Sequence, residues 1–320
     1  MRGFIIRNVA QRLVLLFIAS VLIHSIIHLA PGEPSAVDPM NPRMKPEDVA
    51  KIRAAFHLDD PLYMQYAYWV RDLFTGDLKS FKDNQPALPK IWRRFMNSVP
   101  LFLVAILITW TFAFPTGIYA AVRRGTVYDR FTNIIAYTLI AIPGFFLSYL
   151  LIQWVVETFG VPVIGMKTFG MEQADTFYRV MDRVWHLVLP SVMSGMLGVA
   201  VLSRYVRSQM LEVISQDFVR TARAKGVAED DVIYRHALRN ALLPFVTLLG
   251  LMLPGLIGGS VIFETIFAWP GLGRLGFEAI MSRDFSIVLT INVFAAALTL
   301  LGTLLSDILY GIVDPRIRLQ

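Results

Sequence analysis

Long apolar runs constrain this chain more than any other feature of its sequence. A helix needs about 20 mostly apolar residues to cross the hydrocarbon core of a bilayer. Composition agrees with that interpretation, because 55% of the 320 residues are hydrophobic and only 17% are charged, too few to cover soluble domains of this size. We therefore predict an all-α integral membrane protein with six transmembrane helices. The predicted spans are Leu13–Ala30, Ser98–Val122, Thr132–Val156, Leu187–Val206, Leu242–Phe263 and Val288–Ile312.

Helix breakers interrupt two of these spans. Pro143-Gly144 lies within the third span and Pro254 within the fifth. Such breaks either serve as hinges or are tolerated because neighbouring groups satisfy the backbone, and the sequence favours neither alternative.

The first apolar run also has the basic flank of a signal peptide, since Arg2, Arg7 and Arg12 precede it. It is long for the apolar region of such a peptide, and no A-x-A cleavage pattern follows it. We interpret it as a retained helix.

Basic residues predict which ends of the spans face the cytoplasm. With the N-terminus inside, 15 of the 30 Lys and Arg residues fall in cytoplasmic segments and 5 in the two short outer loops. The other 10 lie in Pro31–Asn97, which is long enough to be translocated largely regardless of charge. We predict that both termini are cytoplasmic. The net charge of +6 is explained by these loops and requires no nucleic-acid partner.

The outer segment Pro31–Asn97 differs from the rest of the chain. Helical patterning covers Pro46–Phe56 and Pro61–Phe74. We expect this patterning to be broken by Gly76-Asp77 and then by the prolines Pro86 and Pro89. Aromatic residues that need burial favour a small folded cap over an extended loop; these are Tyr63, Tyr66, Tyr68, Trp69 and Phe74.

Three parts follow from this division of the chain. Residues 1–30 form an N-terminal transmembrane helix, and residues 31–97 form an extracytoplasmic segment. Residues 98–320 form a five-helix core that carries a cytoplasmic loop at 204–242 between the fourth and fifth spans.

Several kinds of chemistry lack their sequence motifs. There is no G-x-x-x-x-G-K-[ST] loop to cradle ATP phosphates, and there are no cysteines. His24 and His28 have the spacing of metal ligands, but Ser25 stands where a catalytic Glu would be, so we interpret them as an interfacial pair. We predict neither an enzyme nor a metal or cofactor bound by this chain.

Polar residues within the spans are mostly neutral. Asp307 stands alone near the inner end of the last span and is expected to face protein or water, either in a structural bond or in gating. Carriers driven by ions or protons need buried carboxylates or histidines along their path, so the energy source is expected elsewhere. Candidates for the translocation path or its gate are Ser148, Ser194, Asn292, Thr299 and Asp307.

The loop 204–242 carries the strongest functional signal. One short helix is predicted to run to Lys225 and to stop at Gly226, a typical residue just past a helix end. A second begins with the acidic run Glu229–Asp231 and closes with the cations Arg235, His236 and Arg239, in keeping with the helix dipole. Two helices around a sharp turn make a knob that another protein could grip.

The residues of this knob resemble the coupling loop of ABC-importer permeases. The matching runs are Arg220-Thr221-Ala222-Arg223-Ala224-Lys225-Gly226, His236-Ala237-Leu238-Arg239-Asn240 and Leu243-Pro244. The general motif has Glu-Ala-Ala before the glycine and a shorter gap to Leu-Pro, and both departures resemble the dipeptide/oligopeptide branch. Glu264–Gly273 and Tyr310–Arg318 resemble the outer loop and C-terminal tail of that branch.

The resemblance implies a permease subunit in a bacterial or archaeal inner membrane, contacting lipid. Its implied partners are a homologous second permease, one or two P-loop ATPase subunits that bind ATP and Mg²⁺, and an extracytoplasmic binding protein or lipoprotein. The implied cargo is di- or oligopeptides. A nickel chelate, glutathione or an oligosaccharide on the same machinery stays open, as does a stand-alone secondary carrier. The implied coupling residues are Arg220, Thr221, Ala222, Arg223, Ala224, Lys225, Gly226, His236, Arg239 and Asn240.

Overall fold

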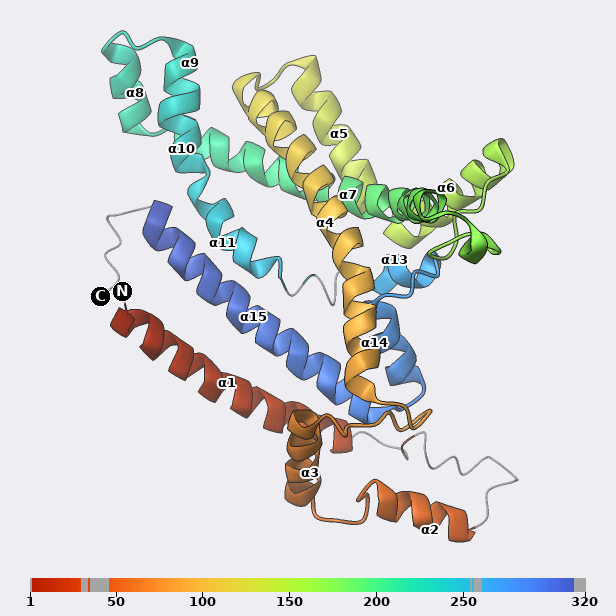
Figure 1. The fold of residues 1–320 in the computed structure, drawn as a ribbon. Helices are drawn as coiled ribbons and strands as arrows, with labels where there is room; N and C mark the ends of the chain where they lie inside the picture. Colours follow the sequence, from red (N-terminus) through yellow and green to blue (C-terminus); the bar gives the residue numbers. More distant parts are fainter. Residues whose placement is uncertain (1, 30–33, 35–45, 254, 256–260, 314–320) are drawn as a thin grey trace.

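The computed structural model describes residues 2–29, 34, 46–253, 255 and 261–313, and these form an all-helical fold with one isolated β-bridge between Lys79 and Pro86. Figure 1 shows long helices that cross the molecule, with short helices at two opposite ends. The elements are α1 (Arg2–Leu29), α2 (Pro46–Ala55), α3 (Leu62–Thr75), α4 (Ala87–Val122), α5 (Val127–Ala141), α6 (Gly144–Phe159), η1 (Met171–Gln173), α7 (Thr176–Ile214), α8 (Asp217–Ala224), α9 (Glu229–Asp231), η2 (Val232–Ala237), α10 (Leu238–Ala241), α11 (Leu243–Leu251), α13 (Val261–Ile266), α14 (Leu272–Met281) and α15 (Phe285–Val313).

Among the described residues, four helices are long and apolar enough to cross a membrane: α1, α4, α7 and α15. The helices α5 and α6 meet the same test only together, as a pair, which would make five. The predicted fifth span, Leu242–Phe263, includes residues 254 and 256–260, which lie outside the described part of the chain, and with them the expected break at residue 254. Its described portions are the helix α11 and the beginning of α13.

The third predicted span, Thr132–Val156, is divided at Pro143, where the sequence places a helix breaker. The chain forms α5 and α6 there, and the two axes are bent by 97°. The bend falls at Ile142, whose backbone is extended (φ −87°, ψ 128°), and at Pro143, which precedes α6. Proline has no N–H to continue the helix, and its ring disfavours the helical conformation of the residue before it.

The second span begins earlier than its apolar run indicates. Helix α4 starts at Ala87, not at Ser98, and continues unbroken to Val122. Pro86 lies immediately before the helix and Pro89 in its first turn, where a missing N–H leaves no intrahelical bond unmade. The expected break after Phe74 is present, since α3 ends at Thr75, and the two prolines in addition initiate the next helix.

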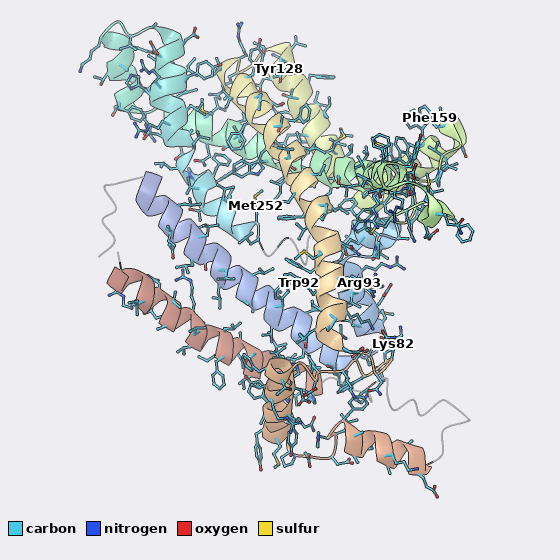
Figure 2. The ribbon with its side chains drawn as sticks, in the orientation of Figure 1. Lys82, Trp92, Arg93, Tyr128, Phe159 and Met252 are labelled. Atoms are coloured by element: carbon cyan, nitrogen blue, oxygen red, sulfur yellow. The ribbon has the colours of Figure 1, made fainter. Side chains whose placement is uncertain are left out.

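Aromatic side chains mark the two ends of α4. Trp92 lies near its start and is exposed, and Tyr128 is exposed at the start of α5, beyond the other end. Figure 2 shows Tyr128 at the opposite end of α4 from Lys82. The stretch from Trp92 to Val122 rises about 45 Å, the thickness of a bilayer with its headgroups. Exposed Trp and Tyr at both ends match the aromatic belts of membrane proteins.

Helices α4 and α7 form the central pair of the bundle, crossing in close contact. A Cβ on Gly117 would overlap the carbonyl oxygen of Ser203, and a Cβ on Gly198 would overlap the Thr109 hydroxyl. The Thr109 hydroxyl donates a hydrogen bond to the Gly195 carbonyl at 3.1 Å. Small residues thus let the two backbones approach closely, as is usual for helix pairs in membranes.

Residues 46–86 fold as a cap against the C-terminal part of α1, against α14 and against the beginning of α15. The helices α2 and α3 match their predicted ranges to within one residue, and Gly76 ends α3 in the left-handed conformation (φ +83°). Trp69 is buried against α14 and α15, and its indole N–H donates to Thr290 Oγ1 at 3.3 Å. Tyr63 and Phe74 are exposed, so only part of the aromatic set is buried here.

A buried carboxylate fastens this cap to α15. Asp284 precedes the first turn of α15 and accepts the Ile287 N–H at 3.4 Å. It also accepts the Ser80 hydroxyl and, at 3.0 Å, the Phe81 N–H from the loop between α3 and α4. One side chain therefore caps a helix and holds the cap segment to it.

Candidate coupling surface

The predicted knob forms a helical hairpin at the end of α7. Helix α7 continues past its predicted end at Val206 to Ile214, so its 39 residues make a rod of about 58 Å. The helices α8, α9, η2 and α10 fold back beyond it, at the end of the molecule opposite α2 and α3 (Figure 1). Val219 of α8 and Val232 and Ala237 of η2 are fully buried in one apolar cluster. This cluster fixes the hairpin to the rod.

Gly226 makes the turn of the hairpin. Its φ is +78°, in the left-handed region that L-residues rarely adopt. The Gly226 N–H donates to the Arg223 carbonyl at 3.0 Å, and the Val227 N–H donates to the Ala222 carbonyl at 3.3 Å. These two bonds form a Schellman motif, which satisfies carbonyls at the end of α8. The glycine is needed for its backbone conformation, since no atom of the described residues lies within 4 Å of the place a Cβ would take.

An ion pair bridges the two arms of the hairpin. Arg223 Nη2 donates to Glu229 Oε1 at 2.7 Å, and Nε donates to Oε2 at 3.0 Å. The hydrogen bond from Arg223 lowers the pKa of Glu229 below its ordinary value. Both side chains are exposed, at 39% and 55%, so the pair contributes less than about 1 kcal/mol to stability. Ala228 provides no side-chain cap for the second helix.

Most of the coupling residues that the family resemblance implies lie on the surface, and one lies in the core. Ala222 is buried in the apolar cluster and supports α8 from beneath. Asn240 is exposed but bonds its own helix, donating to the His236 carbonyl at 2.8 Å. Lys225 and Arg239 have no ion pair within the described ranges. The exposed members are Arg220, Thr221, Arg223, Ala224, Lys225, Gly226, His236, Arg239 and Asn240.

Two features of the hairpin go beyond what its sequence predicts. Phe218 and Tyr234 are large side chains that stand exposed on it, giving the basic surface an apolar component. Residues Val232–Ala237 form a π-helix, a rare conformation that is frequent at functional sites. An exposed aromatic on a short helix has no signature in the sequence, because exposure depends on the packing of the hairpin.

The candidate residues of the translocation path lie on three helices. Ser148 is buried on α6, Ser194 is half-buried on α7, and Asn292 is exposed on α15. Ser148, Asn292 and Thr299 donate to carbonyls of their own helices, each at 2.8 Å. Within the described residues, no hydrogen bond joins any two members of this set.

Asp307 has a partner that the apolar pattern concealed. Its Oδ2 accepts a hydrogen bond from Arg12 Nη2 at 2.6 Å, and Arg12 Nε also donates to the Leu300 carbonyl at 3.1 Å. Arg12 lies inside α1, which begins at Arg2. The pair fastens the start of α1 to the end of α15, and this favours the structural alternative for Asp307 over gating.

Comparison with known proteins assigns the chain to a family. Residues 113–319 match the family described as binding-protein-dependent transport system inner membrane component. Residues 1–108 match the N-terminal family of the same membrane components. The chain belongs to this family of permeases. The predicted resemblance to ABC-importer permeases is therefore confirmed.

Individual relatives match the permease over nearly all of its length. It is 36% identical over 320 residues to the oligopeptide transport system permease protein AppB of Bacillus subtilis (strain 168), covering 99% of this chain and 100% of the relative. It is 33% identical over 336 residues to the dipeptide transport system permease protein DppB of Escherichia coli (strain K12), covering 99% of each.

A solved structure shares the fold. A chain of the MetNI methionine ABC transporter in inward-facing conformations superposes with a TM-score of 0.55 at 19% identity, covering 72% of the permease and 99% of that chain. Permeases of this family are transport subunits of ABC importers, in which a separate subunit hydrolyses ATP. Family membership thus implies ATPase and binding-protein partners in general.

The permease also holds a buried carboxylate on α13, in the segment before α14 and α15. Glu264 is fully buried and accepts the Ser98 hydroxyl at 2.6 Å and the Arg274 N–H at 2.8 Å. The Ser98 oxygen in turn accepts the Leu272 N–H at 2.8 Å. A Cβ on Gly271 would overlap the Glu264 carboxylate. A lone Glu inside an apolar run is the sequence signal for this site.

Proposed function

We propose that this chain is one permease subunit of an ATP-driven importer of di- and oligopeptides. The observation that supports this proposal is the hairpin α8–α10, a charged and partly aromatic surface fastened to the end of a 39-residue helix. The peptide cargo is supported by relatives named for oligopeptide and dipeptide transport, at 36% and 33% identity over the full length. A nickel chelate, glutathione or an oligosaccharide on the same machinery stays an alternative that these relatives do not favour over peptides.

In the proposed arrangement the chain crosses the membrane six times, with both termini and the hairpin in the cytoplasm. The bent pair α5–α6 would supply the third crossing and the segment from α11 to α13 the fifth. Support comes from the basic residues of loop 204–242 and from the position of the cap at the opposite end of α4. The cap would then face the binding protein.

The proposed coupling follows from how a partner can shift an equilibrium. An ATPase moves the permease between inward-open and outward-open states only if its ATP-bound and ATP-free forms bind the hairpin differently. A hairpin held by buried Val219 and Ala222 moves together with α7 and transmits that difference. The proposed complex holds a homologous second permease, one or two P-loop ATPases that bind ATP and Mg²⁺, and an extracytoplasmic binding protein or lipoprotein.

Reconstitution tests the proposal. The chain is purified together with the proposed second permease and ATPase subunits, placed in liposomes containing ATP, and tested for uptake of radiolabelled trialanine in the presence of the binding protein. Uptake should require ATP and every subunit. The matched sample contains this chain alone. Uptake by the lone chain would instead establish a stand-alone carrier, and ATP-driven uptake of another ligand class with no peptide uptake would overturn the cargo.

A further inference from the structure

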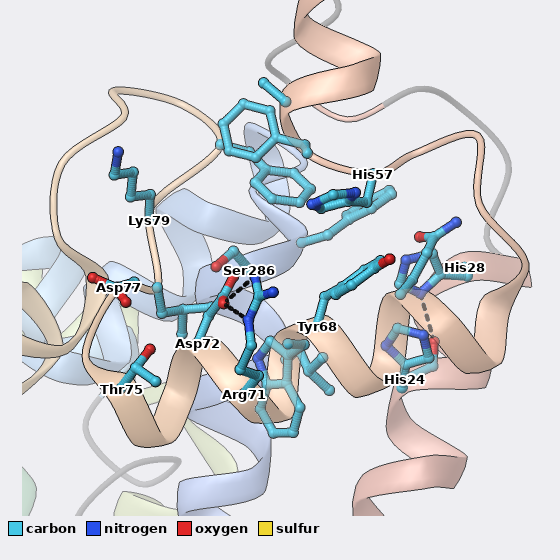
Figure 3. A pocket seen from close by; sticks show the side chains of 18 residues that line it. His24, His28, His57, Tyr68, Arg71, Asp72, Thr75, Asp77, Lys79 and Ser286 are labelled. Atoms are coloured by element: carbon cyan, nitrogen blue, oxygen red, sulfur yellow. Dashed lines mark hydrogen bonds and ion pairs between the residues drawn. The ribbon is translucent and has the colours of Figure 1, made fainter.

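An open cavity of about 480 Å³ lies between the cap and the outer ends of α1 and α15. Figure 3 shows His24 and His28 on one side of it and Asp77 and Lys79 on the other, with Tyr68 between them. The volume falls in the range of about 300–1,000 Å³ that is usual for small-molecule sites.

Two residues that line this cavity each hold a buried polar atom without a partner. Within the described part of the chain, His24 Nδ1 and Ser286 Oγ make no hydrogen bond, although the two residues are only 3% and 4% exposed. They belong to different helices, α1 and α15, which border the same cavity. Buried polar groups are nearly always hydrogen-bonded, and leaving one unpaired costs about 1–3 kcal/mol. Two such atoms on residues that line one cavity indicate a group that binds there.

The bonds that the histidines do make define what this group must offer. His24 Nε2 lies 3.2 Å from the Leu62 carbonyl oxygen, and His28 Nδ1 lies 2.8 Å from the His24 carbonyl oxygen. A carbonyl only accepts, so these two nitrogens carry the protons of the neutral rings. The remaining nitrogens, His24 Nδ1 and His28 Nε2, are therefore acceptors. The histidine side of the cavity suits a ligand that donates hydrogen bonds.

The surrounding rings suit a positive charge. The His28 and Phe285 rings lie 5.9 Å apart next to Ser286, and the His57 and Tyr68 rings stack at 4.1 Å. A guanidinium, that of Arg71, already lies 5.2 Å from the centre of the Tyr68 ring. The faces of aromatic rings attract cations. Arg71 is neutralised by its ion pair with Asp72 at 2.8 Å, so it leaves the cavity little net positive charge.

We propose that this cavity binds a small molecule that carries a primary ammonium group, packs this group against the aromatic wall and donates hydrogen bonds to His24 Nδ1 and Ser286 Oγ. The site belongs to the outer cap and stands independently of whether the chain carries peptides. A cavity of this size takes a molecule larger than a bare ion, and an ammonium offers three donors to the acceptors present.

Calorimetry on the purified full-length chain in nanodiscs tests the site with two probes. Phenylalanine amide has the ammonium and an aromatic ring, and N-acetylphenylalanine amide has the ring without the ammonium. We expect the first to bind and the second to bind at least tenfold more weakly, because hydrogen bonds to a charged group are worth roughly one to two powers of ten in affinity. Equal affinities, or no binding of either probe, would overturn the proposal.

Variants locate the binding. Ser286→Ala and His24→Phe should each weaken the binding of phenylalanine amide roughly tenfold or more. The matched control is Ser25→Ala, whose hydroxyl bonds the Val21 carbonyl on α1 and does not line the cavity; its affinity should be unchanged. Should thermal unfolding show that His24→Phe does not fold, Ser286→Ala carries the test. Zinc binding that requires both His24 and His28, with no amide binding, would establish a metal site and refute the ammonium site.

Discussion

The turn at Gly226 offers the sharpest test of the coupling surface, because the chain contains a matched glycine elsewhere. Gly226 has φ +78° and Gly125, in the turn between α4 and α5, has φ +81°. In the part of the chain that the structure describes, neither has an atom within 4 Å of the position a Cβ would occupy. Alanine at either place meets no clash, and its only cost is that of the left-handed backbone, about 1–2 kcal/mol.

That cost has a defined consequence at each position. A penalty of about 1–2 kcal/mol shifts the equilibrium between the closed hairpin and a frayed α8 roughly 5- to 30-fold toward fraying. We expect Gly226→Ala to lower ATP-driven uptake in proteoliposomes, while the ATPase subunits continue to hydrolyse ATP. Gly125→Ala should destabilise its own turn by a similar amount and leave uptake per hydrolysed ATP near the wild-type value.

The assay compares uptake with phosphate release for the wild type and the two variants, with thermal unfolding as the check on stability. Equal loss of coupling in both variants would mean that the effect is one of general stability. Unchanged coupling in Gly226→Ala would refute the reasoning that the Schellman turn maintains the docking surface.

The outer loop and the ion pair of the hairpin yield three further predictions. Gly271→Ala, at the residue before α14, should destabilise the protein by about 1–3 kcal/mol, because the added methyl overlaps the Glu264 carboxylate. Gly276→Ala within α14 meets only ordinary contacts and should be neutral or stabilising in thermal unfolding. The charge swap Arg223→Glu with Glu229→Arg should retain the bridge and the folded hairpin but lose uptake if Arg223 also contacts the ATPase; full uptake in the double variant would limit Arg223 to a structural role. Because its folded pKa is lowered, Glu229 adds stability that is complete above its unfolded pKa of about 4.3 and is lost as the pH falls through the folded pKa. Limited proteolysis of the hairpin between pH 6 and 3 should therefore show a slightly weaker acid dependence in Glu229→Gln than in the wild type, and an identical dependence would contradict the assignment.

Local signals in the sequence are sufficient to locate the coupling hairpin. Gly226, the acidic start of the second helix at Glu229 and the run of cations after it each mark a helix end through short-range chemistry. Such signals depend on residues within one turn of each other, so they persist in the sequence whatever the rest of the chain does. The same holds for α2 and α3, whose ends are set by Pro46, Pro61 and Gly76.

Helix continuity is harder to predict than helix ends. Two prolines that look alike in the sequence have opposite effects, because Pro86 begins α4 whereas Pro143 bends the third span by 97°. Proline in the first turn of a helix leaves no hydrogen bond unmade, but beyond the first turn its effect depends on its surroundings: α4 continues through Pro100 and Pro115, whereas the chain bends at Pro143. The sequence does not show these surroundings, because they depend on how the helices pack.

By itself, the sequence determined that this chain is a helical membrane protein with a basic hairpin late in its length, because hydrophobic length, charge and capping act locally along the chain. Only the tertiary structure decided that Arg12 pairs with Asp307 and that His24 and Ser286 line one cavity. It also decided that Glu264 accepts hydrogen bonds from the Ser98 hydroxyl and the backbone N–H of Arg274. Each of these joins residues from separate helices. The reason is physical: the position of a polar side chain within an apolar span is written in the sequence, but its partner is fixed only by how the helices pack.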